Sequence, residues 1–177
     1  LEKHGIPTHF VAELNERESA VKRVTIIPLE VIVRNIAAGS LAARLGLEEG
    51  TVLKHTVLEF CYKRDDLDDP IVNEYHIRAL DLAGDDELRL IGDYALRINQ
   101  ILLDYLGEIG ISLIDFKLEF GRTDDNKLIL ADEISPDTCR FWDSKTAKKL
   151  VKDRFRRDLG DVEASYHEVL QRLLGNA

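Results

Sequence analysis

Two apolar runs separated by a short polar turn constrain the fold more than any other part of the sequence. The first run covers residues 111–120, the turn covers residues 123–126, and the second run covers residues 127–133. Apolar runs of this length around a turn rich in Asp and Asn indicate a β-hairpin with a four-residue loop. The sequence therefore predicts an antiparallel strand pair in this part of the chain.

Charged side chains recur along the first strand of this hairpin. Asp115, Lys117 and Glu119 are two residues apart and therefore project from one face of the strand. With the turn centred in its middle, Lys117 pairs with Asp132 and Glu119 pairs with Leu130. Glu119 and Asp132 then lie diagonally on one face, and two carboxylates are a set that Mg²⁺ uses together with substrate phosphate oxygens. A solvated hairpin face is the alternative interpretation, and a slip of one residue would move Asp132 to the other face.

A second strand-forming segment lies earlier in the sequence. Residues 24–33 are dense in β-branched side chains and predict a strand. The alternation of side chains puts Leu29 and Val33 on the core face. Glu30 and Arg34 share the opposite face, so an acid and a base are expected on one surface.

The remaining periodic segments mix helices with strands. Residues 86–106 carry apolar side chains at three- and four-residue steps, and residues 162–173 repeat this pattern before a stop at Gly175. A short helix is expected with Ser40 as its N-cap, and a further strand is expected over residues 57–62. This order of elements predicts an α+β fold.

Two positions outside the hairpin suit the binding of an anion. Residues 134–143 predict an irregular loop, and Arg140 within it has the geometry to bind a carboxylate or phosphate with two hydrogen bonds. A salt bridge to an acidic neighbour is the alternative for Arg140. The start of the helix at Ser40 would offer backbone N–H groups beside Arg34, although a simple cap explains Ser40 equally well.

The composition excludes several classes of protein. The chain has 177 residues, with 33 acidic and 24 basic side chains and a formal net charge of −9, which argues against nucleic-acid or anionic-membrane partners. No apolar run reaches the ~18 residues that are needed to cross a bilayer. The two cysteines, Cys61 and Cys139, are too few for a disulfide framework and favour free thiols in a reducing cytoplasm.

Five motifs, taken in order, are similar to one enzyme family. They are EVIVRNIAAGS at 30–40, YKRD at 62–65 with DP at 69–70 and NE at 73–74, DFKLEFG at 115–121, DEISPDTCR at 132–140 with WD at 142–143, and DRFR at 153–156. Their order and spacing resemble the phosphoribosylaminoimidazole-succinocarboxamide synthase (SAICAR synthetase) family over nearly the whole chain.

The resemblance implies an ATP-dependent ligase of de novo purine biosynthesis. Such an enzyme joins L-aspartate to carboxyaminoimidazole ribonucleotide and yields SAICAR, ADP and phosphate. The resemblance further implies ATP and Mg²⁺ as cofactors, a cytoplasmic homodimer or larger homo-oligomer, and no nucleic-acid or membrane partner. The implied fold is SAICAR synthetase-like and ATP-grasp-related, with antiparallel sheets and flanking helices.

The resemblance also assigns roles to individual residues. Lys117, Glu119 and Asp132 match catalytic positions, and Glu119 and Asp132 would hold the metal. These two carboxylates match the region of the ATP phosphates, and Lys22 begins the hinge that borders adenine. The positions that match substrate-binding residues are Glu30, Arg34, Ser40, Lys63, Asp69, Asp137 and Arg140.

The resemblance implies two domains and one departure from the family. Residues 1–27 match the remainder of an N-terminal ATP-binding subdomain and hinge, and residues 28–177 match the main α+β catalytic and substrate domain. Family members begin with a glycine-rich strand pair that carries a lysine over the ATP phosphates. Because this sequence has neither that segment nor any methionine, we expect that the N-terminal glycine-rich strands are missing from it.

Two other functions stay open at this point. A noncatalytic nucleotide-binding module would bind the same ligands without turnover. A phosphoryl-transfer enzyme would act on another small-molecule carboxylate, because folds of this type host more than one substrate.

Overall fold

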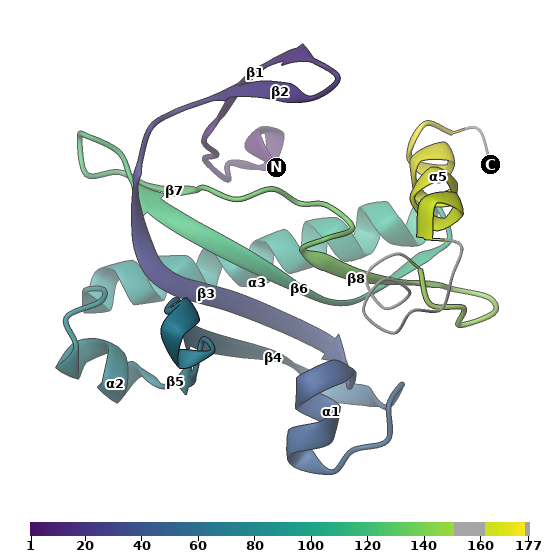
Figure 1. Ribbon diagram of the computed structural model, residues 1–177, viewed down its shortest axis with the longest axis horizontal. Coiled ribbons are helices and arrows are strands. Elements are labelled where there is room, and N and C mark those ends of the chain that lie inside the picture. The colour runs from purple at the N-terminus through teal and green to yellow at the C-terminus, as the bar shows by residue number, and fades with distance from the viewer. Residues whose placement is uncertain (151–161, 176–177) are drawn as a thin grey trace. The chain divides into compact units, whose positions relative to one another are not determined.

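The computed structural model describes residues 1–150 and 162–175 (Figure 1). The chain forms two compact units. The first unit consists of Leu1–Ile32, Leu58–Ile98 and Leu118–Glu133, and the second consists of Val33–Val57, Asn99–Lys117 and Ile134–Ala177. The motif at residues 153–156 lies outside the described residues. The domain boundary expected after residue 27 stays a prediction.

Strands and helices are mixed along the chain, as the sequence predicted. In order, the elements are η1 (Glu2–His4), β1 (Phe10–Asn15), β2 (Glu18–Val21), β3 (Thr25–Ile36), α1 (Gly39–Leu45), β4 (Val52–Tyr62), η2 (Asp65–Leu67), β5 (Ile71–Val72), α2 (Glu74–Ala79), α3 (Asp85–Glu108), β6 (Ile111–Arg122), β7 (Leu128–Leu130), β8 (Cys139–Asp143) and α5 (Val162–Leu173). Strands β1 and β2 form a separate hairpin, and the larger sheet has the hydrogen-bonded order β5-β4-β3-β6-β7, with β8 paired to β6. The pairs β4–β5, β6–β7 and β6–β8 are antiparallel, so the coarse α+β prediction is confirmed.

In the first unit, the core forms between α3 and the strands of the sheet. Ile91, Ala95 and Ile98 are fully buried, which confirms the apolar stripe predicted for this helix. The rings of Tyr94 on α3 and Phe120 on β6 stack with their centroids 6.4 Å apart. Because aromatic rings bury a large apolar area, this contact fixes α3 against β6 within the unit.

The predicted register of the hairpin is wrong by one residue. Phe120 pairs with Leu130, and Arg122 pairs with Leu128, so that Glu119 is not the partner of Leu130. The loop therefore has five residues rather than four, and Asn126 within it adopts a left-handed conformation with φ +57°. The expected pairing of Lys117 with Asp132 fails as well, because the Lys117 amide donates to the carbonyl of Thr138 at 2.9 Å.

In the second unit, part of the expected loop is a strand. Residues 134–143 were expected to be irregular, but β8 begins at Cys139 and pairs with β6. Trp142 of β8 packs with Ala38 and Ile114 in a buried cluster. This strand was missed because it is buried along most of its length and so lacks the alternation of a half-exposed strand.

The apolar spacing in residues 162–173 indicated an inward face with Tyr166, Val169, Leu170 and Leu173, and helix α5 does not bury this face. Val169 is buried, but Tyr166, Leu170 and Leu173 are exposed over more than a third of their surface. Ser165 is buried beside Val169 instead. The inward face is therefore rotated from the predicted one, because the chain buries a small polar side chain in place of larger apolar ones.

Two further observations bear on the predicted class of protein. Cys61 and Cys139 are buried free thiols, as predicted. Among residues 1–150 and 162–175, no helix combines the length and the apolar character needed to cross a membrane.

Candidate functional site

Two arginines with predicted substrate-binding roles meet on one carboxylate in the second unit. Arg34 lies on β3, Arg140 lies on β8, and Asp115 lies on β6. The Nη1 atom of Arg34 donates to Oδ2 of Asp115 at 3.0 Å, and Nη1 of Arg140 donates to the same oxygen. The three side chains are only 4–7% exposed. Arg140 thus has an acidic partner, but the partner comes from the neighbouring strand and not from the adjacent sequence.

Ser40 joins this arrangement through Arg34. The Nη2 atom of Arg34 donates to Oγ of Ser40 at 3.1 Å. Helix α1 begins at Gly39 and its N-cap is Ala38, so the prediction that Ser40 caps the helix is wrong. The hydroxyl of Ser40 is used to hold an arginine rather than the backbone of the first helical turn.

Gly39 allows Arg140 to approach the start of α1. Gly39 has φ +53°, and a Cβ atom at this position would lie 2.8 Å from Nη2 of Arg140. A residue other than glycine would therefore meet both an unfavourable backbone conformation and a steric clash. The sequence pattern that places glycine before Ser40 is explained by this contact.

Together, Arg34, Ser40, Asp115 and Arg140 form what we call the arginine site. Its two guanidinium groups carry two positive charges, and Asp115 carries one negative charge. Buried charges are costly unless they are paired, and guanidinium groups bind carboxylates and phosphates with good geometry. Two buried guanidinium groups with a shared hydrogen-bond partner are suited to an anionic ligand group.

In the first unit, the structure brings Lys63 and Glu119 together. Lys63 follows β4, and its backbone amide donates to the carbonyl of Pro28 at 3.0 Å. The Nζ atom of Lys63 then lies 2.9 Å from Oε1 of Glu119 on β6. The Glu119 side chain is 10% exposed, so the interpretation of this strand face as a solvated surface is wrong.

Asp132 lies in the segment that runs beside Glu119. The amide of Ala131 donates to the carbonyl of Glu119 at 2.9 Å, and Oδ1 of Asp132 accepts from the amide of Glu133 at 2.9 Å. The two predicted metal ligands therefore come from neighbouring stretches of the same unit. Within the described residues, no group of three or more His, Cys, Asp or Glu side chains is arranged to hold a metal ion.

The other predicted residues have local contacts. The Nζ atom of Lys22 donates to the carbonyl of Thr8 at 3.0 Å, and Oδ1 of Asp69 accepts from the amide of Arg64 at 2.7 Å. Glu30 is half-buried on β3, and Lys117 is half-buried on β6. Their predicted roles in binding and catalysis stay predictions.

Tyr166 is a residue near the predicted site that sequence reasoning missed. Its hydroxyl donates to Oδ1 of Asp137. Partial removal of Tyr166 from water, together with the hydrogen bond to the neighbouring Asp137 carboxylate, raises the pKa of Tyr166 to about 12. The residue was assigned to an apolar helix face, and nothing in its local sequence pointed to Asp137. Asp115 was also given no role, although its place on one strand face with Lys117 and Glu119 was a signal.

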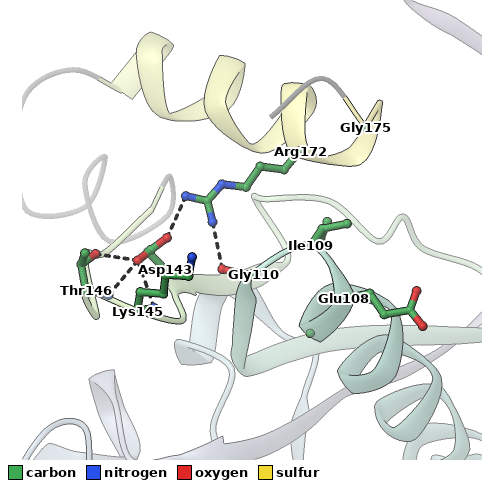
Figure 2. Close-up of a pocket in the computed structure, with 9 residues that line it drawn as sticks. Glu108, Ile109, Gly110, Asp143, Lys145, Thr146, Arg172 and Gly175 are labelled. Atoms are coloured by element: carbon green, nitrogen blue, oxygen red, sulfur yellow. Dashed lines mark hydrogen bonds and ion pairs between the residues drawn. The ribbon is translucent and has the colours of Figure 1, made fainter.

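A cavity of about 760 Å³ opens elsewhere in the second unit (Figure 2). It is lined by Gly107, Glu108, Ile109, Gly110, Asp143, Lys145, Thr146, Arg172 and Gly175. Arg172 donates to the carbonyl of Gly110 and to Oδ2 of Asp143, both at 2.8 Å, as Figure 2 shows. Hydrogen bonds from the Thr146 hydroxyl, and then from Arg172, hold the pKa of Asp143 far below its usual range. None of the predicted site residues lines this cavity.

Comparisons with known proteins agree with the resemblance seen in the motifs. Residues 1–173 match the model of the SAICAR synthetase family. A phosphoribosylaminoimidazole-succinocarboxamide synthase from Coprothermobacter proteolyticus is 61% identical over 173 residues, which are 98% of this chain and 73% of that protein.

Solved structures are similar over the same span. A SAICAR synthetase (Type-2) in complex with ADP has a TM-score of 0.95 and 49% identity, covering 98% of this chain and 74% of that one. The synthase from Ehrlichia chaffeensis has a TM-score of 0.94 and 48% identity, covering 97% of this chain and 74% of that one. The chain therefore belongs to the SAICAR synthetase family, as its five motifs predicted.

Proposed function

We propose that this chain supplies the substrate-binding and catalytic groups of an ATP-dependent ligase of purine biosynthesis. The enzyme joins L-aspartate to carboxyaminoimidazole ribonucleotide and forms SAICAR, ADP and phosphate. The observation that carries this function is the family match over residues 1–173. A ligase that forms a C–N bond follows from the same match, at 61% identity to a synthase of that name.

The chemistry of amide formation explains why such a site needs cations. A carboxylate is a poor electrophile, so transfer of the γ-phosphoryl group from ATP to the ribonucleotide carboxylate forms an acyl phosphate and releases ADP. The aspartate amine then attacks the acyl carbon, the C–N bond forms, and phosphate leaves. Because the protein contributes mainly orientation and charge stabilisation to such transfers, positively charged groups in a dry site are the main requirement.

The arginine site meets this requirement for the ribonucleotide. Arg34 and Arg140 offer buried guanidinium groups, and Ser40 offers a hydroxyl next to Arg34. A phosphate group accepts hydrogen bonds from all three side chains in this role. Glu30, Asp69 and Asp137 complete the proposed substrate-binding set.

Glu119 and Asp132 suit Mg²⁺ by the chemistry of their donor atoms. Mg²⁺ takes carboxylate oxygens and keeps its remaining positions for water and substrate phosphates, so two protein carboxylates are enough. Glu119 is buried beside the backbone that leads to Asp132, which supports a shared site. When bound, the ion would neutralise charge on the ATP phosphates. Lys63 forms an ion pair with Glu119 and so holds its side chain in place. Lys117 is the proposed catalytic lysine, and Lys22 is proposed to bind the nucleotide.

Nucleotide use has support from a relative. A SAICAR synthetase that is 49% identical to this chain was solved in complex with ADP, which is a product of the proposed reaction. An ATP-grasp-related nucleotide fold, a glycine-rich strand pair in the complete protein, a homo-oligomeric state and a cytoplasmic location are proposed on the family resemblance. Light scattering on the purified protein tests the oligomeric state.

Turnover by the complete protein that contains this chain is the test of the function. With all three substrates, chromatography should detect SAICAR and ADP in equal amounts. ADP release that continues without aspartate would favour a phosphoryl-transfer enzyme on another carboxylate. Calorimetric binding of the ribonucleotide and Mg-ATP without any product would favour the noncatalytic module.

Variants of the proposed metal ligands test their role. Glu119→Ala and Asp132→Ala should each abolish turnover, whereas Asp124→Ala, in the exposed loop of the same hairpin, should leave it unchanged. Near-normal rates in both site variants would reject the metal role.

A further inference from the structure

Asp115 occupies the position where an anionic ligand of Arg34 and Arg140 would be expected. A single oxygen, Oδ2, accepts hydrogen bonds from both guanidinium groups. The carboxylate is 4% exposed, and it belongs to the protein itself. A phosphate group that enters the arginine site must therefore share or replace hydrogen bonds that Asp115 already holds.

The position of Asp115 between the two arginines has a physical reason. Two buried guanidinium groups repel each other, and removal of water makes this repulsion stronger than at the surface. A carboxylate between them cancels one charge and fixes both side chains through directed hydrogen bonds. The same carboxylate lowers the attraction that the arginine site exerts on any incoming anion.

We propose that Asp115 is an internal counter-anion of the substrate site. It holds Arg34 and Arg140 in position before the ribonucleotide binds, and it weakens their hold on the ribonucleotide phosphate so that the product can leave. Asp115 is a positioning residue in this account, because it acts through the two arginines. The inference rests on the proposed function only in assigning an anionic substrate group to this site.

Charge counting over these three side chains gives a specific series of variants. Relative to the wild type, Asp115→Asn adds one positive charge to this group. Arg140→Gln removes one, and the double variant Asp115→Asn/Arg140→Gln returns the charge to the wild-type value. The affinity for inorganic phosphate should follow this order.

Isothermal titration calorimetry with inorganic phosphate on the complete protein measures the series. Asp115→Asn should bind roughly tenfold more tightly than the wild type, since it removes a negative charge that repels the anion at close range. Arg140→Gln should bind more weakly than the wild type, and the double variant should bind more tightly than Arg140→Gln. Asp143→Asn removes a different carboxylate that is bonded to an arginine in the same unit, and it should bind as the wild type does.

Two results would overturn the proposal. If Asp115→Asn binds phosphate no better than the wild type, Asp115 only orients the arginines or supports the fold. If the double variant binds no better than Arg140→Gln, the charge of Asp115 does not oppose the ligand. A purely structural Asp115 predicts both results, because a second damaging substitution would not improve binding.

Thermal unfolding tests the same proposal if Asp115→Asn is too unstable for calorimetry. Asp115→Asn should melt at a lower temperature than the wild type, and phosphate should raise its melting temperature by more than it raises that of the wild type. An equal or smaller rise contradicts the proposal. If the variant folds only when phosphate is present, the counter-anion role is supported, whereas an inability to fold in phosphate and chloride alike contradicts it.

These measurements need neither ATP nor aspartate, so they separate the inference from the ligase function. If the protein makes no SAICAR but its variants follow the predicted order of phosphate affinities, the proposed ligase function is rejected and the counter-anion role of Asp115 is supported. If the protein makes SAICAR but its variants do not follow this order, the ligase function is supported and the counter-anion role is rejected.

Discussion

The Nζ atom of Lys63 lies 2.9 Å from Oε1 of Glu119, so a predicted substrate-binding lysine and a predicted metal ligand form an ion pair. Glu119 is nearly buried, while Lys63 retains access to solvent. A carboxylate in such a position needs a cationic partner, since an isolated charge is costly to remove from water. Lys63 supplies this partner and fixes the direction of the Glu119 side chain.

Replacing Lys63 by Met should destabilise the fold and slow turnover. Loss of one cationic partner of a nearly buried carboxylate costs about 1–3 kcal/mol, and chemical denaturation measures this cost. Lys127→Met is the matched control, because Lys127 pairs with Asp125 on the surface, where an ion pair contributes about 0–1 kcal/mol. If the two variants lose the same free energy of unfolding, the Lys63–Glu119 pair contributes no more than a surface ion pair.

Substitution of Gly39 should damage the arginine site as well as the fold. Gly39→Ala places a Cβ atom 2.8 Å from Nη2 of Arg140 and also forces alanine into φ +53°. Gly46→Ala is the control, because Gly46 has φ +64° and an added Cβ would meet nothing within 4 Å. Both variants should lose about 1–2 kcal/mol through the backbone conformation.

Only Gly39→Ala should also raise the KM for the ribonucleotide, because it displaces Arg140. Steady-state kinetics on both variants separates the two effects. A KM that rises equally in Gly46→Ala would assign the loss to the stability of α1.

Acid should remove a stabilising contribution of Asp143. Hydrogen bonds from Thr146 and Arg172 hold the pKa of Asp143 far below its usual value in the folded chain. A group whose folded pKa is lowered stabilises the protein above its unfolded pKa, about 3.9 for Asp, and loses this effect as the pH falls from there toward the folded pKa. The wild type should therefore melt above Asp143→Asn at neutral pH, and this difference should shrink below about pH 4.

Thermal melts of both proteins across this pH range measure the effect. Asp104→Asn is the control, since Asp104 is an exposed helix carboxylate that accepts a hydrogen bond from Gln100. A difference between wild type and Asp143→Asn that stays constant with pH contradicts the prediction.

Removing the hydroxyl of Tyr166 should release Asp137. Tyr166→Phe keeps the ring and deletes one hydrogen bond to a carboxylate, which costs about 1.5–3 kcal/mol of stability at most. If Asp137 binds substrate, kcat/KM should fall several-fold while the fold persists. Tyr105→Phe is the control, because Tyr105 is a half-exposed helix residue, and it should change neither the stability nor kcat/KM. Unchanged kinetics in Tyr166→Phe would indicate that Asp137 does not need this contact.

Periodicity predicted the elements whose burial is one-sided. The stripe of Ile91, Ala95 and Ile98 is buried as expected, because a helix packed on a sheet hides one face and exposes the other. Strand β8 gave no such signal, since four of its five residues are buried. Its polar neighbours then made the whole of residues 134–143 resemble a loop.

Partners across the sheet were beyond the reach of the sequence alone. Arg140 is 25 residues from Asp115, and Arg34 is 81 residues from it. Only the order of β3, β6 and β8 brings the three side chains together, and local pattern does not determine strand order. The resemblance of the motifs to the family nevertheless identified both arginines as binding residues. It gave no information about which side chains they contact.

The predicted register of the hairpin was wrong because of the assumed length of its loop. The turn was taken to have four residues, but Arg122 already pairs with Leu128 and leaves five residues between them. The left-handed Asn126 accommodates the additional residue.

The length of segment 123–127 therefore matters more to the register of the hairpin than the identity of its residues. Most side chains in it are exposed, so many substitutions there leave the rest of the molecule unaffected. Deletion of a single residue, however, would advance every later residue by one position along β6 and exchange the two sides of β7. The side chain of Asp132 would then change its direction relative to Glu119 without any change to its own codon.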